Sequence, residues 1–259
     1  MLFRSARIAA SGVDTACVRV VYGASGVALV TVDAAGENTI VVTPGANAAF
    51  TALTAEELGA VRAADVLVAQ LEVPVETVTE AAVAARAAGT RVILNATPAR
   101  SLTAELLSAV DLLVLSEAEA RAVIGAPETV GHPPPGTSAL LGALLRVVPA
   151  VVLTLGARGA WYAAHDRPAV HVPPVLVSVV DSTAAGDAFT GALAVAWGEG
   201  REPVDAVRWA SAAAAACARR MGASVALPRR AEIDELYLAA RASATDVSPA
   251  ADGPSADDA

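Results

Sequence analysis

Short apolar runs alternate with longer segments of helical periodicity through the middle of the chain. The apolar runs predict strands at 66–70, 91–95, 112–115 and 151–154, and the periodic segments predict helices at 76–88, 102–109, 117–124 and up to Val147 after the Pro/Gly-rich loop 131–136. Strands that are apolar on both faces and alternate with helices indicate a mostly parallel sheet covered by helices. The pattern therefore predicts an α/β fold.

The two ends of the chain depart from this alternation. Residues 26–33 and 37–43 flank a small turn and predict an antiparallel hairpin, either a plain edge hairpin or a lid or dimer surface. From residue 188 the pattern is helical, over 188–197, 204–220 and 230–241. Residues 243–259 are mostly Ala, Asp, Ser and Pro, so we expect one domain over 1–242, with a hairpin lid at about 24–44, and a disordered tail.

Composition narrows the class of protein. The chain has 259 residues, 55% of them hydrophobic, which is enough for one sizeable core. We expect no membrane span, because long uncharged apolar runs are missing from the sequence, and no signal peptide, so a cytoplasmic location is predicted. The net charge of −9 argues against nucleic acid as a partner. Every cation is Arg, and the absence of Lys excludes a P-loop.

Cysteine and histidine give little sign of metal chemistry. Cys17 and Cys217 are far apart in apolar stretches, which indicates small buried residues and neither a disulfide nor a metal site. The three histidines, His132, His165 and His171, are scattered near prolines and loops, so a metal cluster is not expected.

The segment Asp181-Ser-Thr-Ala-Ala-Gly-Asp187 carries the clearest chemical signal. It lies between the apolar run 175–180, which predicts a strand, and the helix that begins near Ala188. Small residues at such a turn direct backbone N–H groups and the positive end of a helix dipole at one point, where a phosphate or a developing negative charge can bind. An aspartate beside such a site can act as a base, which is the minimum machinery of a small-molecule kinase. The alternative is that Asp187 only caps its helix.

Polar residues follow each of the four predicted strands. In a parallel sheet the carboxyl ends of the strands share one edge, where ligands of open α/β sheets bind, although each residue alone could be a cap or turn residue. The residues are Gln70 and Glu72, Asn95 and Thr97, Ser116 to Glu119, and Thr154 to Gly159.

Six motifs occur in order along the chain and belong to one known pattern. They are Gly36-Glu-Asn-Thr-Ile-Val-Val-Thr-Pro-Gly-Ala-Asn47, Gln70-Leu-Glu-Val-Pro74, Asn95-Ala-Thr-Pro-Ala99, Ser116-Glu-Ala-Glu119, Thr154-Leu-Gly-Ala-Arg-Gly159 and Asp181-Ser-Thr-Ala-Ala-Gly-Asp187. Over residues 13–240 the chain resembles the ribokinase-like family of carbohydrate kinases. The resemblance implies a three-layer α-β-α sandwich with a mostly parallel sheet and a small β-hairpin lid. The first two motifs favour members that phosphorylate ribose.

The resemblance implies an ATP-dependent transfer of phosphate to O5 of D-ribose. Asp187 would be the general base, beside an anion hole formed by the backbone of Ala184, Ala185, Gly186 and Asp187. Glu72 would contact the sugar, and Glu119 would hold Mg²⁺ through water. The implied ATP-binding residues are Ser116, Thr154, Leu155, Gly156, Ala157, Arg158, Gly159, Gly186, Asp187 and Ser211. A K⁺ site would be formed by Asp181, Thr183, Cys217, Arg220, Gly222 and Ala226. Family members often form homodimers through the lid.

The chain departs from the family pattern at four places. Ser116 replaces an Asn, Ser211 replaces a larger polar residue near adenine, and Ala226 replaces a Ser of the cation site. The family's first segment, which carries most sugar contacts, has no counterpart, so we expect a fragment or a start codon placed too far downstream. Two alternatives stay open: a kinase of another sugar or nucleoside, of the fructose or adenosine type, and a non-catalytic chain that binds nucleotide.

Overall fold

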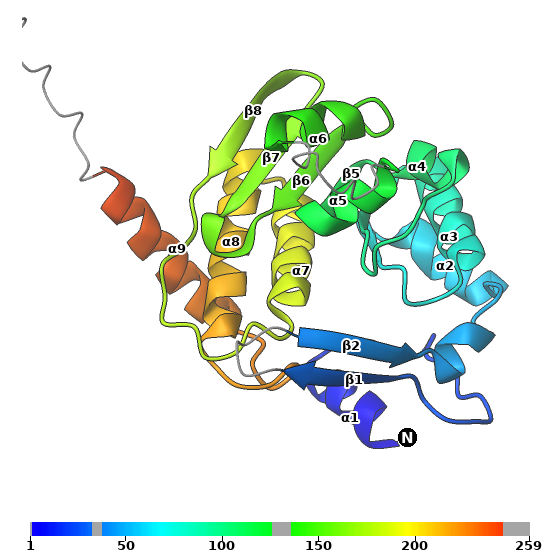
Figure 1. The fold of residues 1–259 in the computed structure, drawn as a ribbon. Helices are drawn as coiled ribbons and strands as arrows, with labels where there is room; N and C mark the ends of the chain where they lie inside the picture. Colours follow the sequence, from blue (N-terminus) through cyan, green and yellow to red (C-terminus); the bar gives the residue numbers. More distant parts are fainter. Residues whose placement is uncertain (1, 33–37, 126–135, 246–259) are drawn as a thin grey trace, which may run out of the picture. The chain divides into compact units, whose positions relative to one another are not determined.

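A computed structural model describes residues 2–32, 38–125 and 136–245 of the chain (Figure 1). The chain divides into two compact units, each of which is described by itself. The sheet unit comprises Met1–Leu155 and Ala160–His171, and the helical unit comprises Gly156–Gly159 and Val172–Ala259.

The sheet unit is organised around a six-stranded sheet with the strand order β3-β4-β5-β6-β7-β8. Its strands are β3 (Val66–Ala69), β4 (Arg91–Asn95), β5 (Leu112–Ser116), β6 (Ala150–Thr154), β7 (Ala160–Ala164) and β8 (Arg167–Val172). The pairings of β3 with β4, β4 with β5 and β5 with β6 are parallel, and β7 runs antiparallel to β6. The four predicted strands and their parallel arrangement are confirmed. β7 and β8 were missed.

Helices of the same unit pack on the sheet and bury alternate side chains of its strands (Figure 1). They are α2 (Ala55–Ala63), α3 (Val75–Ala88), α4 (Ala104–Ala109), α5 (Glu117–Val123) and α6 (Thr137–Leu144). The unit also contains α1 (Leu2–Ala10) and a short 3₁₀ helix η1 at Gly45–Ala49. Leu94, Leu113 and Leu153 come from three neighbouring strands and share one core with Leu106 of α4 and Leu140 of α6. Each buried leucine stabilises the fold by about 1.5–3 kcal/mol.

The predicted hairpin is confirmed as a separate two-stranded sheet of β1 (Val27–Val32) and β2 (Asn38–Thr43). Its turn, at 33–37, lies outside the described residues. The antiparallel register places Leu29 opposite Val41. At its base, Gly45 has a positive φ of 50°, and a Cβ there would lie 2.6 Å from the carbonyl oxygen of Ala24, so only glycine fits.

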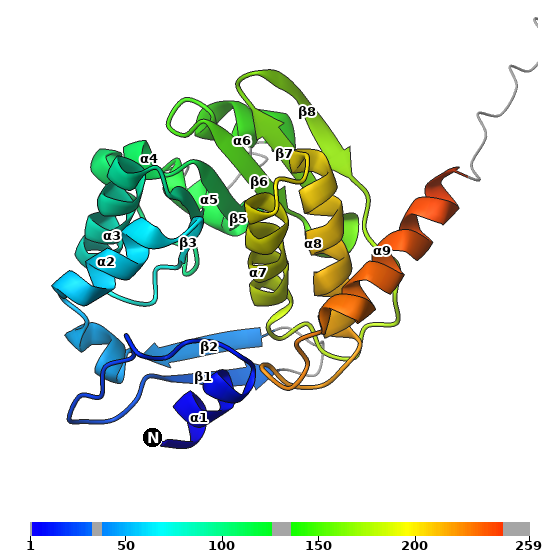
Figure 2. The same ribbon diagram turned by 180° about the vertical axis from the view of Figure 1, so that it is seen from behind.

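The helical unit contains α7 (Ala185–Gly198), α8 (Pro203–Ala218), α9 (Arg230–Thr245) and the 3₁₀ turn η2 at Gly156–Arg158. Figure 2 shows α7 and α8 side by side. The Nε1–H of Trp209 in α8 donates to Asp234 of α9 at 2.7 Å, and the guanidinium groups of Arg201 and Arg230 lie 5.0 and 5.3 Å from the Trp209 ring. This cluster holds α9 against α8 through cation–π contacts and a charge-assisted hydrogen bond.

The predicted strand at 175–180 is wrong, because these residues form an irregular segment. Pro173 and Pro174 precede it and cannot donate hydrogen bonds to a neighbouring strand. The N–H of Val180 bonds instead to the carbonyl of Ala218, and the side chain of Leu176 is 87% exposed. High β-propensity does not form a strand where the backbone finds no sheet partner.

Composition predicts a disordered tail at 243–259 and no membrane span. α9 continues to Thr245, so 243–245 of the predicted disordered tail are helical, and 246–259 lie outside the described residues. In the described ranges, the helices are too short or too polar to cross a lipid bilayer.

Candidate active site

The first turn of α7 presents backbone N–H groups that have no hydrogen-bond partner in the described part of the chain. Ala184 precedes the helix in the left-handed conformation, with φ 61°, and its side chain cannot cap the helix. The N–H of Ala185 donates to the carbonyl of Ser182 at 3.1 Å. Among the described residues, nothing accepts a hydrogen bond from the N–H of Gly186 or Asp187. These two donors and the helix dipole can therefore bind an anion.

Asp187 is the third residue of α7 and lies in its first turn. In the described part of the chain no donor bonds to the Asp187 carboxylate, so it does not cap the helix. Partial desolvation raises the pKa of Asp187 above the usual value for aspartate. A carboxylate with free lone pairs and a raised proton affinity, next to an anion site, is suited to accept a proton from a hydroxyl group.

The left-handed conformation of Ala184 predicts a measurable stability effect. Because left-handed backbone costs a non-glycine residue about 1–2 kcal/mol, Ala184→Gly should raise the free energy of unfolding by up to about 1 kcal/mol. The neighbouring Ala185→Gly is the matched control. Because Ala185 is helical, its replacement by glycine should lower the free energy of unfolding by about 0.5–1 kcal/mol. Urea unfolding of both variants measures the difference, and an equal loss of stability in the two would contradict the interpretation.

Asp181 connects the loop before α7 to the segment that follows α8. One carboxylate oxygen accepts from the N–H of Thr183 at 2.9 Å, and the other accepts from the N–H of Gly222 at 2.8 Å. The Thr183 hydroxyl and then these two N–H groups hold the pKa of Asp181 below its usual value. The carboxylate therefore stays ionised and fixes the loop.

The other residues of the predicted K⁺ site lie around the same loop. The thiol of Cys217 lies 3.6 Å from the Thr183 carbonyl and packs with Ala226, and burial raises its pKa. The N–H of Arg220 bonds to the Cys217 carbonyl, and its side chain forms an ion pair with Glu232 at 3.0 Å. The structure thus brings all six predicted residues into one network. Within the described ranges, His, Cys, Asp and Glu form no cluster of three or more that could hold a metal alone.

Glu119 is fixed at the carboxyl end of β5 in the sheet unit. Its Oε2 accepts from the N–H of Ser116 at 2.7 Å, and Ser116 caps the helix in return. Its Oε1 accepts from the hydroxyl of Thr97 at 2.5 Å. Ser116 therefore starts α5 and closes a capping box with Glu119.

The strand-end residues of the sheet unit lie along one edge, as parallel order requires. Thr154 is the register partner of Ser116, and its hydroxyl donates to the Leu115 carbonyl at 3.3 Å. The N–H of Leu71, which follows β3, donates to the carbonyl of Thr97 at 2.8 Å. Glu72 follows β3 and Thr97 follows the neighbouring strand β4, so the two residues lie at adjacent strand ends. Leu155 comes directly after Thr154, the last residue of β6.

The remaining predicted nucleotide-binding residues lie in the helical unit. Gly156, Ala157 and Arg158 form η2, which Gly159 ends at φ 85°. Ser211 is in α8, where its hydroxyl donates to the Val207 carbonyl at 2.9 Å. The two groups of predicted site residues, in the sheet unit and in the helical unit, are each locally organised.

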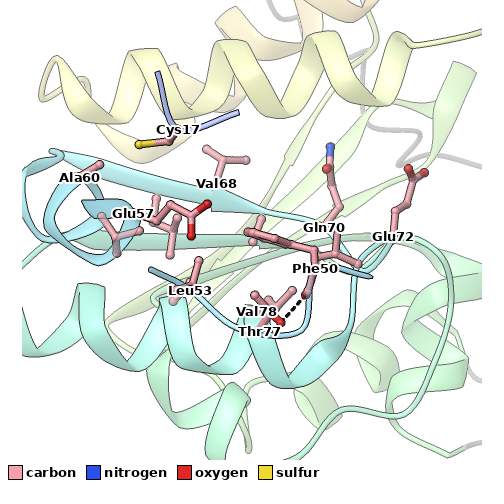
Figure 3. Close-up of a pocket in the computed structure, with 15 residues that line it drawn as sticks. Cys17, Phe50, Leu53, Glu57, Ala60, Val68, Gln70, Glu72, Thr77 and Val78 are labelled. Atoms are coloured by element: carbon pink, nitrogen blue, oxygen red, sulfur yellow. Dashed lines mark hydrogen bonds between the residues drawn. The ribbon is translucent and has the colours of Figure 1, made fainter. Parts of the chain in front are cut away.

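A pocket of about 360 Å³ lies beside β3, an edge strand of the sheet (Figure 3). Gln70 and Glu72 stand together at one end of it, and Phe50 lies over its middle, where the Thr77 hydroxyl donates to the Phe50 carbonyl. Most of its lining is apolar, and its buried Glu57 is already paired with Arg19 at 2.9 Å. Such a lining does not suit a sugar, so only the Glu72 end matches the predicted substrate contact.

Comparison with known proteins places this arrangement in a family. The profile described as "pfkB family carbohydrate kinase" matches residues 3–230. The chain belongs to the pfkB family of carbohydrate kinases. The predicted ribokinase-like α/β fold, with its mostly parallel sheet and small hairpin, is confirmed.

Individual pfkB kinases agree with this assignment. The chain is 31% identical over 229 residues to the ribokinase of Staphylococcus aureus, covering 86% of this chain and 74% of that protein. It is 40% identical over 174 residues to a bifunctional ribokinase/ribose-5-phosphate isomerase A of Fructilactobacillus sanfranciscensis, of which it spans 31%. The structure of Arabidopsis thaliana ribokinase complexed with ribose and ATP matches 83% of this chain and 70% of that one, with a TM-score of 0.75 and 28% identity.

Proposed function

We propose that this pfkB kinase transfers the γ-phosphate of ATP to O5 of D-ribose, giving D-ribose 5-phosphate and ADP. The observation that carries the proposal is the start of α7, where the Asp187 carboxylate and two backbone N–H groups have no hydrogen-bond partner among the described residues. Similarity to ribokinases supports ribose as the acceptor and ATP as the donor.

Each part of the α7 turn has a role in this reaction. The Asp187 carboxylate accepts the proton of the O5 hydroxyl as that oxygen attacks the γ-phosphorus in line. The N–H groups of Gly186 and Asp187 stabilise charge that develops on the transferring phosphoryl group. Glu72 binds hydroxyl groups of the sugar. The residues Ser116, Thr154 to Gly159 and Ser211 contact the nucleotide.

Two ions belong to the proposal. Mg²⁺ usually reaches kinases on the nucleotide and needs only one or two carboxylates, which fits Glu119 with its oxygen-bearing neighbours Thr97 and Asn95. When bound, it neutralises charge on the phosphates. The loop around Asp181, Thr183 and Gly222 offers carboxylate and carbonyl oxygens, which fit K⁺ as an activator that orders the turn. Because the reaction consumes ATP, we place it in the cytoplasm.

The test of the proposal is release of ADP by the purified chain with ATP and Mg²⁺. We expect release with D-ribose that exceeds release with 2-deoxyribose, fructose or adenosine, and faster release in K⁺ than in Na⁺. A higher rate with another acceptor would reassign the substrate. Nucleotide binding without release on any acceptor would contradict a kinase.

We also propose that two copies of the chain pair through the hairpin. Val27, Leu29 and Val41 occupy one face of it and are 58, 63 and 60% exposed. Leu29→Lys should convert the dimer to monomer in sedimentation velocity, because a charge would be buried in the interface. Val42→Lys is the control, since Val42 lies on the opposite face. A monomeric parent chain, or equal dissociation by both variants, would refute the pairing.

A further inference from the structure

Asn95, Thr97 and Glu119 form a chain of hydrogen bonds across the ends of two neighbouring strands. Thr97 Oγ1 lies 2.5 Å from Glu119 Oε1 and 3.2 Å from Asn95 Oδ1. A hydroxyl has a single proton, and the charged, nearer acceptor takes it. Asn95 Oδ1 is the longer, neutral acceptor of the same hydroxyl group. The Thr97 hydroxyl therefore donates to Glu119.

The backbone holds Thr97 in the place that this contact requires. Its carbonyl accepts from the N–H of Leu71, and its N–H donates to the carbonyl of Asn95, both at 2.8 Å. Asn95 is 8% exposed and belongs to the β4–β5 ladder. Thr97 is therefore anchored to two strands, and it transmits that rigidity to the Glu119 side chain.

Both carboxylate oxygens of Glu119 are now restrained, one by Thr97 and one by the N–H of Ser116. Each oxygen keeps a further lone pair that can accept from a water molecule. A carboxylate held in one orientation loses little rotamer freedom when it engages an ion through water. A neighbouring group that only orients a metal-binding side chain typically changes metal affinity 10–100-fold.

We propose that Thr97 is a positioning residue that fixes Glu119 for the divalent ion accompanying the nucleotide. The inference rests on the proposed function, because it concerns that ion. It assigns to Thr97 an effect on metal affinity, with no direct contact to substrate. The buried Asn95 lies beside the same hydroxyl, with its Oδ1 at 3.2 Å.

The test is binding of Mn²⁺, followed by electron paramagnetic resonance, to the chain with a non-hydrolysable ATP analogue. Thr97→Val should weaken Mn²⁺ binding about tenfold or more. Its affinity for the nucleotide without metal should stay at the parent value. Thr97→Ser keeps the hydroxyl and should bind Mn²⁺ like the parent chain. Thr79→Val removes a threonine hydroxyl from α3 of the same unit, where it bonds to Val75, and should leave Mn²⁺ affinity unchanged.

The possible outcomes separate this inference from the function on which it rests. Parent-like Mn²⁺ affinity in Thr97→Val overturns the inference and leaves the kinase proposal standing. Equal weakening by Thr97→Val and Thr79→Val assigns the hydroxyl a purely structural role and also overturns it. Failure of the parent chain to bind the metal–nucleotide pair overturns the proposed function itself.

Discussion

Asp187→Asn should lower turnover by about 10²–10⁴-fold while the fold stays intact, because the amide cannot accept the proton of the attacking hydroxyl. ADP release at saturating substrates measures the loss. Affinity for the nucleotide should change little, since the N–H groups of the α7 turn remain. Undiminished turnover would show that Asp187 is not the general base.

The stability of the same variant provides an independent check. Burial raises the pKa of Asp187, so this carboxyl stabilises the folded chain below the unfolded pKa, and the stabilisation is lost as pH rises through the folded pKa. At pH 7 the charged group is therefore unfavourable, and Asp187→Asn should be at least as stable as the parent chain. The acid limb of turnover should correspondingly lie at a higher pH than an ordinary aspartate would give.

Asp205 offers a matched control, because it is the third residue of α8 as Asp187 is of α7. It accepts a hydrogen bond from the Tyr237 hydroxyl and lies 3.6 Å from Arg201. Asp205→Asn should therefore lose stability and keep its turnover. Asp187→Asn should thus lose turnover but not stability, and Asp205→Asn should lose stability but not turnover. This contrast distinguishes a catalytic carboxylate from a structural one.

Gly159→Ala should destabilise the folded chain by about 2–5 kcal/mol, the largest stability effect that we expect from adding one methyl group. Gly159 has φ 85°, and a Cβ there would lie 2.2 Å from the carbonyl oxygen of Val172. Left-handed strain and overlap with backbone both contribute. Because the segment Thr154 to Gly159 is proposed to pass around the nucleotide, ATP affinity should also fall. Urea unfolding and nucleotide titration measure the two effects.

Gly156→Ala is the control within the same turn. Gly156 has φ 58°, but a Cβ there meets no atom within 4 Å among the described residues. The free energy of unfolding of this variant should fall by only about 1–2 kcal/mol, which is the cost of a left-handed backbone at a residue other than glycine. Equal losses in the two variants would show that the close approach of Gly159 to Val172 is unimportant.

The sequence predicts those parts of the fold in which local pattern and tertiary partner agree. The runs around Ile93, Val114 and Val152 are long and apolar enough to be buried strands, and the structure has them as β4, β5 and β6. β8 was missed because Arg167-Pro-Ala-Val-His-Val172 contains a proline and lacks an apolar run. Residues 175–180 have the opposite property: their β-propensity is strong, but they pair with no strand in the described part of the chain.

The candidate site was predictable in its residues and less so in its contacts. Parallel order places Thr97 and Glu119 at one edge of the sheet, so their proximity follows from strand order alone. The hydrogen bond between them joins residues 22 positions apart and depends on the backbone path after β4, which no local pattern encodes. The left-handed Ala184 is likewise invisible in sequence, because alanine is a strong helix former.

The most direct test of the proposed function is ³¹P NMR of the purified chain with ATP, Mg²⁺, K⁺ and D-ribose. Transfer to O5 predicts a phosphomonoester resonance, split by the two protons on C5, that grows together with ADP. Formation of ADP with inorganic phosphate alone, or intact ATP in a sample whose nucleotide is shown to be bound, would contradict the proposed transfer.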